Sequence, residues 1–232
     1  MGDALFYQVA TWKVQLFVYT ERMPHRSYDQ YCSVARALDV VGERWALLIV
    51  RELLAGPRRY TDLHADLPGV STDVLASRLK DLERDGLAVR RRLTRSGATY
   101  VYELTPRGRG LLPVLAALAD WGTPALEERR PTDAVRAHWL AIPLLQRLAP
   151  LTGPHTGTVG VQLDEGAFHL RFDESGPGYG DGPAEQPDAR LTLSAATCLE
   201  VTRGTLALAR GVKEGRIELD GSGPLADALA ER

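Results

Sequence analysis

From residue 31 to residue 66 the hydrophobic side chains recur three or four positions apart, which is the spacing of amphipathic helices. Gly42 ends the first of these segments, and Gly56-Pro57 ends the second. A third, shorter segment covers residues 60–66. The pattern therefore predicts three short helices in this part of the chain.

A fourth helix is expected to begin at Ser71 or Thr72, because a hydroxyl side chain caps the free N–H groups of a helix N-terminus. Two segments of alternating polarity follow at 87–93 and 99–104, with the turn residues Ser96-Gly97 between them. This order of helices and a β-hairpin predicts a winged helix-turn-helix.

One further helix is expected from Thr105-Pro106 to residue 122, and the polar segment 127–133 then marks a boundary. Beyond it the pattern predicts a helix, two paired strands, a loop, a strand, two helices, a strand and a last helix. They cover residues 133–150, 157–163, 167–173, 175–188, 189–194, 195–204, 205–211, 215–221 and 224–232. The expected fold class is α+β, with an N-terminal arm or extension at 1–27, a DNA-binding domain at 28–126 and a second domain at 131–232.

The charge is unevenly distributed along the chain, although the formal net charge is only −2. Residues 51–110 hold 12 Lys or Arg and 8 Asp or Glu, whereas residues 131–232 hold 9 and 14. The excess of positive charge in the first of these segments favours binding of a polyanion.

Two cysteines form no disulfide framework, and no apolar run approaches membrane-spanning length, so we expect a soluble, cytoplasmic protein.

Short polar side chains on the fourth helix would let it enter the major groove of DNA, where Arg78 could read a guanine edge. The arginines of the hairpin and those before the third helix suit phosphate contacts. For any single arginine, a solvated surface position is the simpler alternative. The predicted DNA-binding residues are Arg58, Arg59, Tyr60, Ser71, Thr72, Ser77, Arg78, Lys80, Arg91, Arg92 and Arg95.

Three spaced motifs occur in order: YCSVARALDVVGERWALLIVRELLAGPRRYTDL, LASRLKDLERDGLAVRRRL and YELTPRGRGLLPVLAALADWG. Together they resemble the HxlR family of MarR-related bacterial winged-helix regulators, over roughly residues 28–124. The resemblance implies a homodimer, built from the first helix and the helix after the wing, and a palindromic DNA operator. Repression is the default sign of regulation.

Several members of that family carry a cysteine at the start of the first helix that senses oxidants or electrophiles, and Cys32 matches this position. The usual proline after it is replaced by Ser33. A buried, inert cysteine is the alternative. We interpret Cys198 as a core residue.

The end of the second domain resembles the C-terminal half of a sterol-carrier-protein-type domain, through element order and the motif GRIELDG. The resemblance implies an α/β sandwich that encloses an apolar tunnel, which would bind a small apolar or aromatic metabolite. The alternative is that the same side chains fill a core. The expected ligand-binding residues are Trp139, Leu144, Phe168, Leu170, Phe172, Leu199 and Leu206.

Catalytic motifs and metal-ligand spacings are absent from the sequence, and the five histidines are scattered. We therefore expect no enzyme, no metal and no cofactor. The expected function is a dimeric transcriptional regulator with an effector domain. The alternatives are a thiol-based redox regulator acting through Cys32, and a carrier or enzyme whose DNA binding is secondary.

Overall fold

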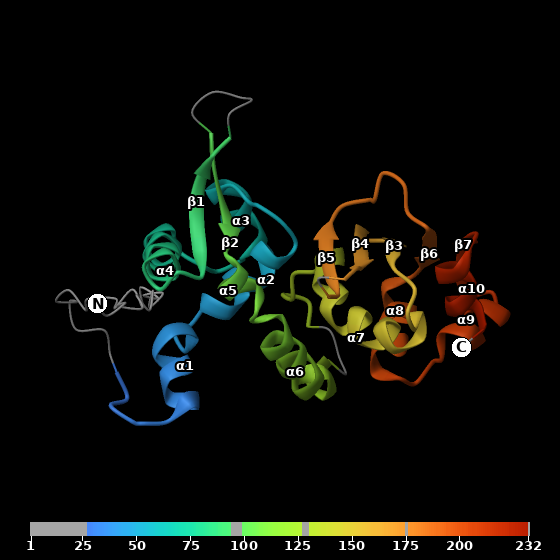
Figure 1. The fold of residues 1–232 in the computed structure, drawn as a ribbon, viewed down its shortest axis with the longest axis horizontal. Helices are drawn as coiled ribbons and strands as arrows, with labels where there is room; N and C mark the ends of the chain where they lie inside the picture. Colours follow the sequence, from blue (N-terminus) through green and yellow to red (C-terminus); the bar gives the residue numbers. More distant parts are fainter. Residues whose placement is uncertain (1–26, 94–98, 127–129, 175, 232) are drawn as a thin grey trace, which may run out of the picture. The chain divides into compact units, whose positions relative to one another are not determined.

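The computed structural model describes residues 27–93, 99–126, 130–174 and 176–231 (Figure 1). The chain divides into two compact units after Asp39. Helix α1 (Ser33–Val41) begins in the first unit directly after Cys32, and its last two residues belong to the second. The backbone N–H of Tyr28 donates to Oδ1 of Asp39 over 2.9 Å, which ties the segment before α1 to the helix. The predicted N-terminal arm lies outside the described residues except for Ser27.

The second unit opens with the three short helices α2 (Ala46–Leu54), α3 (Tyr60–Asp66) and α4 (Thr72–Arg84). They pack through fully buried leucines, among them Leu63, Leu75 and Leu79. Ser71 caps α4, since its hydroxyl accepts the backbone N–H of Val74 at 3.3 Å. The helices expected from hydrophobic spacing are therefore present.

The wing is the antiparallel pair β1 (Ala88–Arg92) and β2 (Tyr100–Leu104). Arg58, which lies before α3, forms an isolated β-bridge with Tyr102 and so extends the base of the wing. The turn expected at Ser96-Gly97 lies outside the described residues. The first part of this unit is a winged helix-turn-helix (Figure 1).

One expected helix after Thr105 is in fact two, α5 (Pro106–Arg109) and α6 (Leu112–Gly122), followed by the 3₁₀ turn Thr123–Leu126. One reason for the break is local, and another is a contact with a distant part of the chain. Pro113 has no N–H to donate to the preceding turn, so it fits only the first turn of a new helix. Gly108 also lies so close to the carbonyl oxygen of Leu87 that a Cβ would be 2.1 Å away.

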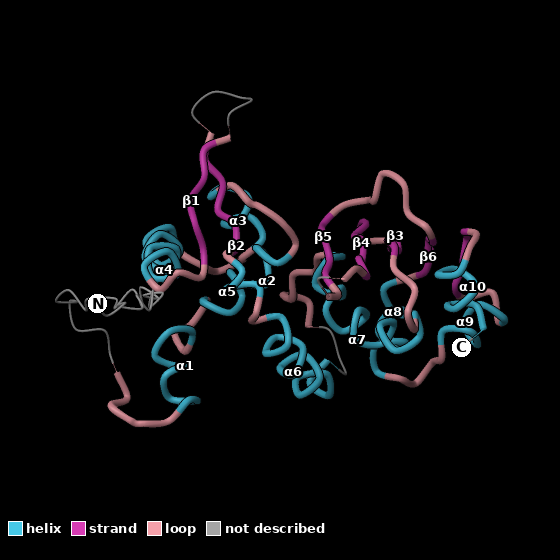
Figure 2. The backbone as a smooth tube through the Cα atoms, viewed as in Figure 1, coloured by secondary structure: helices cyan, strands magenta, loops and turns pink. Residues whose placement is uncertain are grey.

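Within the described residues, the remaining strands form one five-stranded sheet in the order β5-β4-β3-β6-β7 (Figure 2). β3 and β6 run parallel, and the other neighbours are antiparallel. The strands are β3 (Gly157–Leu163), β4 (Gly166–Phe172), β5 (Gly178–Asp181), β6 (Ala189–Leu193) and β7 (Ile217–Gly221). The helices are α7 (Ala141–Thr152), α8 (Ala195–Arg203), α9 (Leu208–Lys213) and α10 (Pro224–Glu231), with a 3₁₀ turn at Ala137–Leu140.

Two expectations for this half were wrong in detail. The helix expected from residue 133 begins at Ala141, because Arg136 is extended and its guanidinium binds Asp66 at 3.0 Å. The segment 175–188, expected to be a loop, contains β5, which exists through its pairing with β4 rather than through its own pattern. The α+β class is confirmed, with α7 packed against β4 and β5.

Candidate nucleic-acid interface

Helix α4 presents a face of short polar side chains to solvent. Leu75, Leu79 and Leu82 turn inward, while Thr72, Ser77 and Lys80 are exposed. Its 13 residues make a helix about 20 Å long, and small side chains on the outer face allow the backbone to approach base edges. This exposed face of α4 can therefore serve as a recognition surface.

A hydrogen bond fixes the geometry between α3 and α4. The hydroxyl of Tyr60, the first residue of α3, donates to the backbone carbonyl of Thr72 over 2.8 Å. Tyr60 thus links α3 to α4, the two helices of the helix-turn-helix, in addition to any contact that it makes with DNA.

Register separates the arginines of the wing into two faces. Arg90 lies opposite Tyr102 and Arg92 opposite Tyr100, so these four side chains share one face of the hairpin. Arg91 points to the other face, where its guanidinium bonds Glu103 at 2.9 Å. Arg92 is exposed and has no ion-pair partner in the part of the chain that the structure describes. Arg95 lies outside the described residues.

A groove of about 480 Å³ runs between the start of α3 and the Arg90 face of the wing. The guanidinium of Arg90 stacks on the ring of Tyr100 at 4.0 Å, which leaves its edge available to an anion. The groove residues are Arg59, Tyr60, Thr61, Arg90, Thr99, Tyr100 and Tyr102. Two arginines and aromatic rings around one hollow can hold a phosphodiester backbone.

Two further predicted contact residues have carboxylate partners, as Arg91 does. Arg58 is 15% exposed, and its guanidinium bonds Asp181 at 2.8 Å. Arg78 is 23% exposed and bonds Asp81 at 2.7 Å, with Glu43 at 3.8 Å. Arg58 is not among the residues that line the groove, and Arg78 must leave its carboxylate partners before it can read a base.

Sequence reasoning selected Tyr60 but not Arg90, Tyr100 or Tyr102, which also line the groove. Side chains alternate along a strand, so Arg90 and Arg91 of β1 lie on opposite faces of the hairpin, in agreement with the register. Tyr100 and Tyr102 gave no separate signal, because alternating aromatic residues are also typical of a structural strand.

Five of the seven expected ligand-binding residues belong to the hydrophobic core. Phe168, Leu170 and Leu144 have no exposed surface, and Phe172 and Leu206 are also buried. Trp139 and Leu199 are partly buried. Their role in ligand binding stays a prediction, since the same placement is that of a hydrophobic core.

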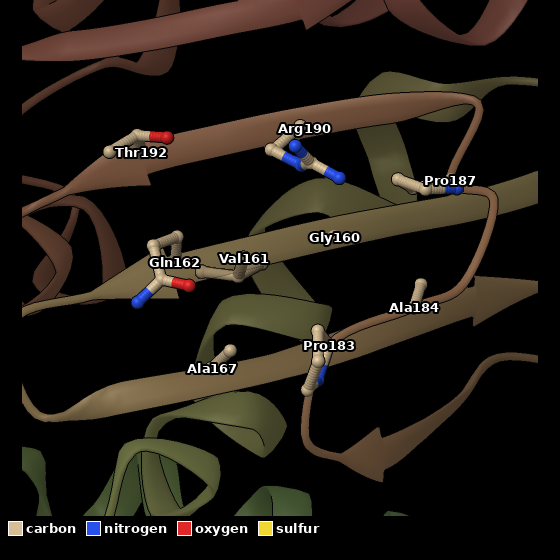
Figure 3. Close-up of a pocket in the computed structure, with 9 residues that line it drawn as sticks. All are labelled: Gly160, Val161, Gln162, Ala167, Pro183, Ala184, Pro187, Arg190 and Thr192. Carbon is tan, nitrogen blue, oxygen red and sulfur yellow. The ribbon is translucent and has the colours of Figure 1, made fainter.

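A groove of about 310 Å³ lies on the other side of the sheet, and none of those seven residues lines it. Figure 3 shows its floor on β3 and β6, with Gly160 at the centre, and Arg190 beside Pro187. Small residues and prolines make most of its wall. Sequence reasoning gave no signal for this groove.

The two cysteines differ in exposure and in the pKa of their thiols. Cys32 is exposed, and backbone N–H groups of Ala35 and Val34 lower the pKa of its thiol. Burial raises the pKa of Cys198 to about 12, and this residue is a core residue as expected.

Among the described residues no group of three or more His, Cys, Asp or Glu is placed to hold a metal ion. No described helix is long and apolar enough to cross a membrane.

Sequence comparison agrees with the fold. Three helices and a basic hairpin in this order define the winged helix-turn-helix class of transcriptional regulators. Residues 40–130 match the family described as HxlR-like helix-turn-helix. The chain is also 38% identical over 88 residues to the uncharacterized HTH-type transcriptional regulator YvaP of Bacillus subtilis, a match that covers 38% of this chain and 82% of that protein. The chain belongs to the HxlR-like helix-turn-helix family.

Other relatives match over a similar number of residues. The uncharacterized HTH-type transcriptional regulator sll1512 of Synechocystis is 37% identical over 97 residues, which cover 42% of this chain and 72% of that protein. The HTH-type transcriptional regulator YodB of Bacillus subtilis is 33% identical over 85 residues, covering 37% of this chain and 76% of that protein. The solved structure of reduced YodB has a TM-score of 0.38 at 29% identity, and covers 44% of this chain and 100% of that one.

Proposed function

We propose that this regulator binds duplex DNA by placing α4 in the major groove and the Arg90 face of the wing against the phosphate backbone. The observation that carries the proposal is the groove between α3 and the wing, where Arg59 and Arg90 converge. The exposed Ser77 and Lys80 of α4 then reach base edges or adjacent phosphates.

The regulator acts as a homodimer on a palindromic operator. Val114, Leu118 and Trp121 lie on one side of α6 and are 45%, 44% and 84% exposed. An exposed apolar row of this kind marks an association surface. In a two-fold dimer the two α4 helices would reach half-sites about 34–36 Å apart.

The test is fluorescence anisotropy with genomic promoter fragments and with random duplex of equal length. The wild type is expected to prefer one fragment, and its affinity is expected to fall steeply with salt. Arg92→Ala removes one phosphate contact, so the slope of log affinity against log salt should become shallower by about one. Lys80→Ala should weaken binding as well.

Arg210→Ala is the matched control, because Arg210 is an exposed arginine of α9 whose side chain bonds Glu214. It should leave both affinity and salt slope unchanged. Equal binding of all duplexes by the wild type, even at low salt, would contradict the proposal.

We further propose that residues 131–232 form a sterol-carrier-like effector domain for a small apolar or aromatic metabolite. The observed order β6, α8, α9, β7, α10, with β7 ending at Gly221, supports the resemblance seen in the sequence. A thermal-shift panel of such compounds tests the idea, and a panel without any stabilising compound would count against it. Arg190→Ala should keep the shift if the ligand lies among the buried residues, and lose it if the ligand lies in the groove of Figure 3.

A second candidate is regulation by oxidants or electrophiles through Cys32. The specific observation in its favour is an exposed thiol whose pKa is lowered by backbone N–H groups at the start of α1.

A further inference from the structure

A cluster of ionic side chains joins α2 to residues 137–139 and to β5. Glu52 of α2 has no exposed surface, and His138 is 3% exposed. Nε2 of His138 lies 2.6 Å from Oε2 of Glu52, and Nδ1 lies 3.2 Å from Oδ1 of Asp181. A protonated imidazole therefore donates one hydrogen bond to each carboxylate.

The second carboxylate oxygen of Glu52 has two hydrogen-bond donors. Oε1 accepts from the indole of Trp139 at 2.9 Å and from the guanidinium of Arg51 at 2.7 Å. The guanidinium of Arg51 lies over the ring of Trp139, 4.4 Å from its centroid. The hydroxyl of Tyr179 donates to the backbone carbonyl of Arg51 at 2.7 Å. Side chains from α2, from residues 138–139 and from β5 thus surround Glu52.

Asp181, at the more exposed edge of the cluster, extends these contacts to the wing. Its Oδ2 accepts from Arg58 at 2.8 Å, and its backbone N–H donates to the carbonyl of Ala55 at 3.3 Å. The backbone of Arg58 exchanges two hydrogen bonds with Tyr102 of β2, at 3.0 and 2.8 Å. A continuous series of hydrogen bonds therefore runs from His138 to the base of the wing.

The stability of this junction does not by itself require buried ions. Well-packed apolar residues in the same place can stabilise a protein at least as well as a buried ion pair. A fully hydrogen-bonded ionic cluster instead specifies one arrangement of α2, residues 137–139 and β5 relative to one another. Burial acts to lower the pKa of His138, but its hydrogen bonds to Asp181 and Glu52 raise it to about 9. The hydrogen bond from His138 holds the pKa of Asp181 well below its usual range. The cluster is therefore ionised at neutral pH.

We propose that His138 and Asp181 are positioning residues for DNA binding, which hold Arg58 and with it the base of the wing in the arrangement that contacts DNA. The inference rests on the proposed DNA-binding function and adds a route for its regulation. A ligand that displaces β5 from Arg58 would loosen the wing and lower the affinity for DNA.

Two charge-matched variants test the proposal on the promoter fragment that the wild type prefers. Asp181→Asn and Asp220→Asn each remove one negative charge from the same sheet, but Asp220 is exposed and has no ion pair within the described part of the chain. Loss of negative charge by itself favours DNA binding. Asp220→Asn should therefore bind as tightly as the wild type or slightly more tightly, whereas Asp181→Asn should bind about fivefold more weakly or worse.

Amide exchange supplies a readout at the wing itself. In Asp181→Asn the amide of Tyr102, which donates to the carbonyl of Arg58, should exchange faster while that of Leu82 in α4 does not. Should this variant fail to fold, the wild type is measured between about pH 7 and pH 10, where His138 loses its proton. The exchange of Tyr102 relative to Leu82, corrected for intrinsic rates, should then rise.

Equal affinities of the two variants, tighter binding by Asp181→Asn, or an unchanged exchange ratio would overturn the positioning role and leave the proposed function standing. A wild type that prefers no promoter fragment would overturn the proposed function, and the inference with it.

Discussion

The imidazole of His138 makes stability depend on pH. The pKa of His138 in the folded protein, about 9, lies above the ordinary value of 6.5. Its contribution to the free energy of unfolding is therefore fully present below about pH 6.5 and is lost as the pH rises through about 9. Glu52 and Arg51 face it from α2, Asp181 faces it from β5, and Arg58 lies beyond Asp181. The carboxylates stay charged over this range, so the proton lost is that of the imidazole.

Urea unfolding at several pH values measures this dependence. The wild type should lose stability on the order of 3 kcal/mol between about pH 6.5 and pH 10. His138→Gln should be less stable near neutral pH and show a flatter profile, because glutamine does not titrate. Parallel profiles of the two proteins would contradict the assignment.

The thiol of Cys32 should react with iodoacetamide in the native protein, with a midpoint of reaction below the usual thiol pKa, because the thiolate is the reactive form. Cys198 is an internal control, since it is fully buried and should react only after unfolding. If oxidants release DNA from the wild type, Cys32→Ser should abolish that response. The same response in Cys32→Ser would exclude the redox mechanism.

Helix α4 depends on its cap. Ser71→Ala removes the hydroxyl that accepts the N–H of Val74 and should cost about 1 kcal/mol in thermal or urea unfolding. Ser77→Ala is the matched control, because the same change at an exposed position inside α4 should cost nothing or stabilise slightly through the helix propensity of alanine. Equal losses would show that the cap is not the cause.

Elements with local signals were predictable from the sequence. The bounds of α3 and the cap of α4 follow from adjacent residues, and the hairpin follows from alternation. β5 was missed because the Gly178–Asp181 segment has one large apolar side chain, Tyr179, and becomes a strand only beside β4. The break between α5 and α6 depends partly on Leu87, which lies against Gly108 from a distant part of the chain.

The candidate site was predictable in part for the same reason. The basic wing and the polar face of α4 are visible in the sequence as composition and spacing. Neither spacing nor motif brings Glu52 to His138, which are 86 positions apart, or turns Arg58 toward Asp181, 123 positions away. Those contacts arise from tertiary packing alone.

The proposed association of two copies concerns the whole molecule, and the proposal places it at the exposed row of α6. Trp121→Glu places a charge at the most exposed member of that apolar row and should weaken the dimer about 30-fold or more, as judged by sedimentation equilibrium. Ala207→Glu adds the same charge at an exposed position next to α9 and should leave association unchanged. A Trp121→Glu protein with wild-type association would place the interface elsewhere.

β3 occupies the middle of the larger sheet, and its partner β6 comes much later in the chain, so that Val159 pairs with Ala189. During synthesis β4 becomes available to pair with β3 before β6 does, so we expect one edge of β3 to keep its N–H and C=O groups free until β6 emerges. Such an open edge is a template for a strand of another molecule. A polypeptide cut short before residue 189 should therefore aggregate as its concentration rises, visible as light scattering, even though its helix-turn-helix is complete.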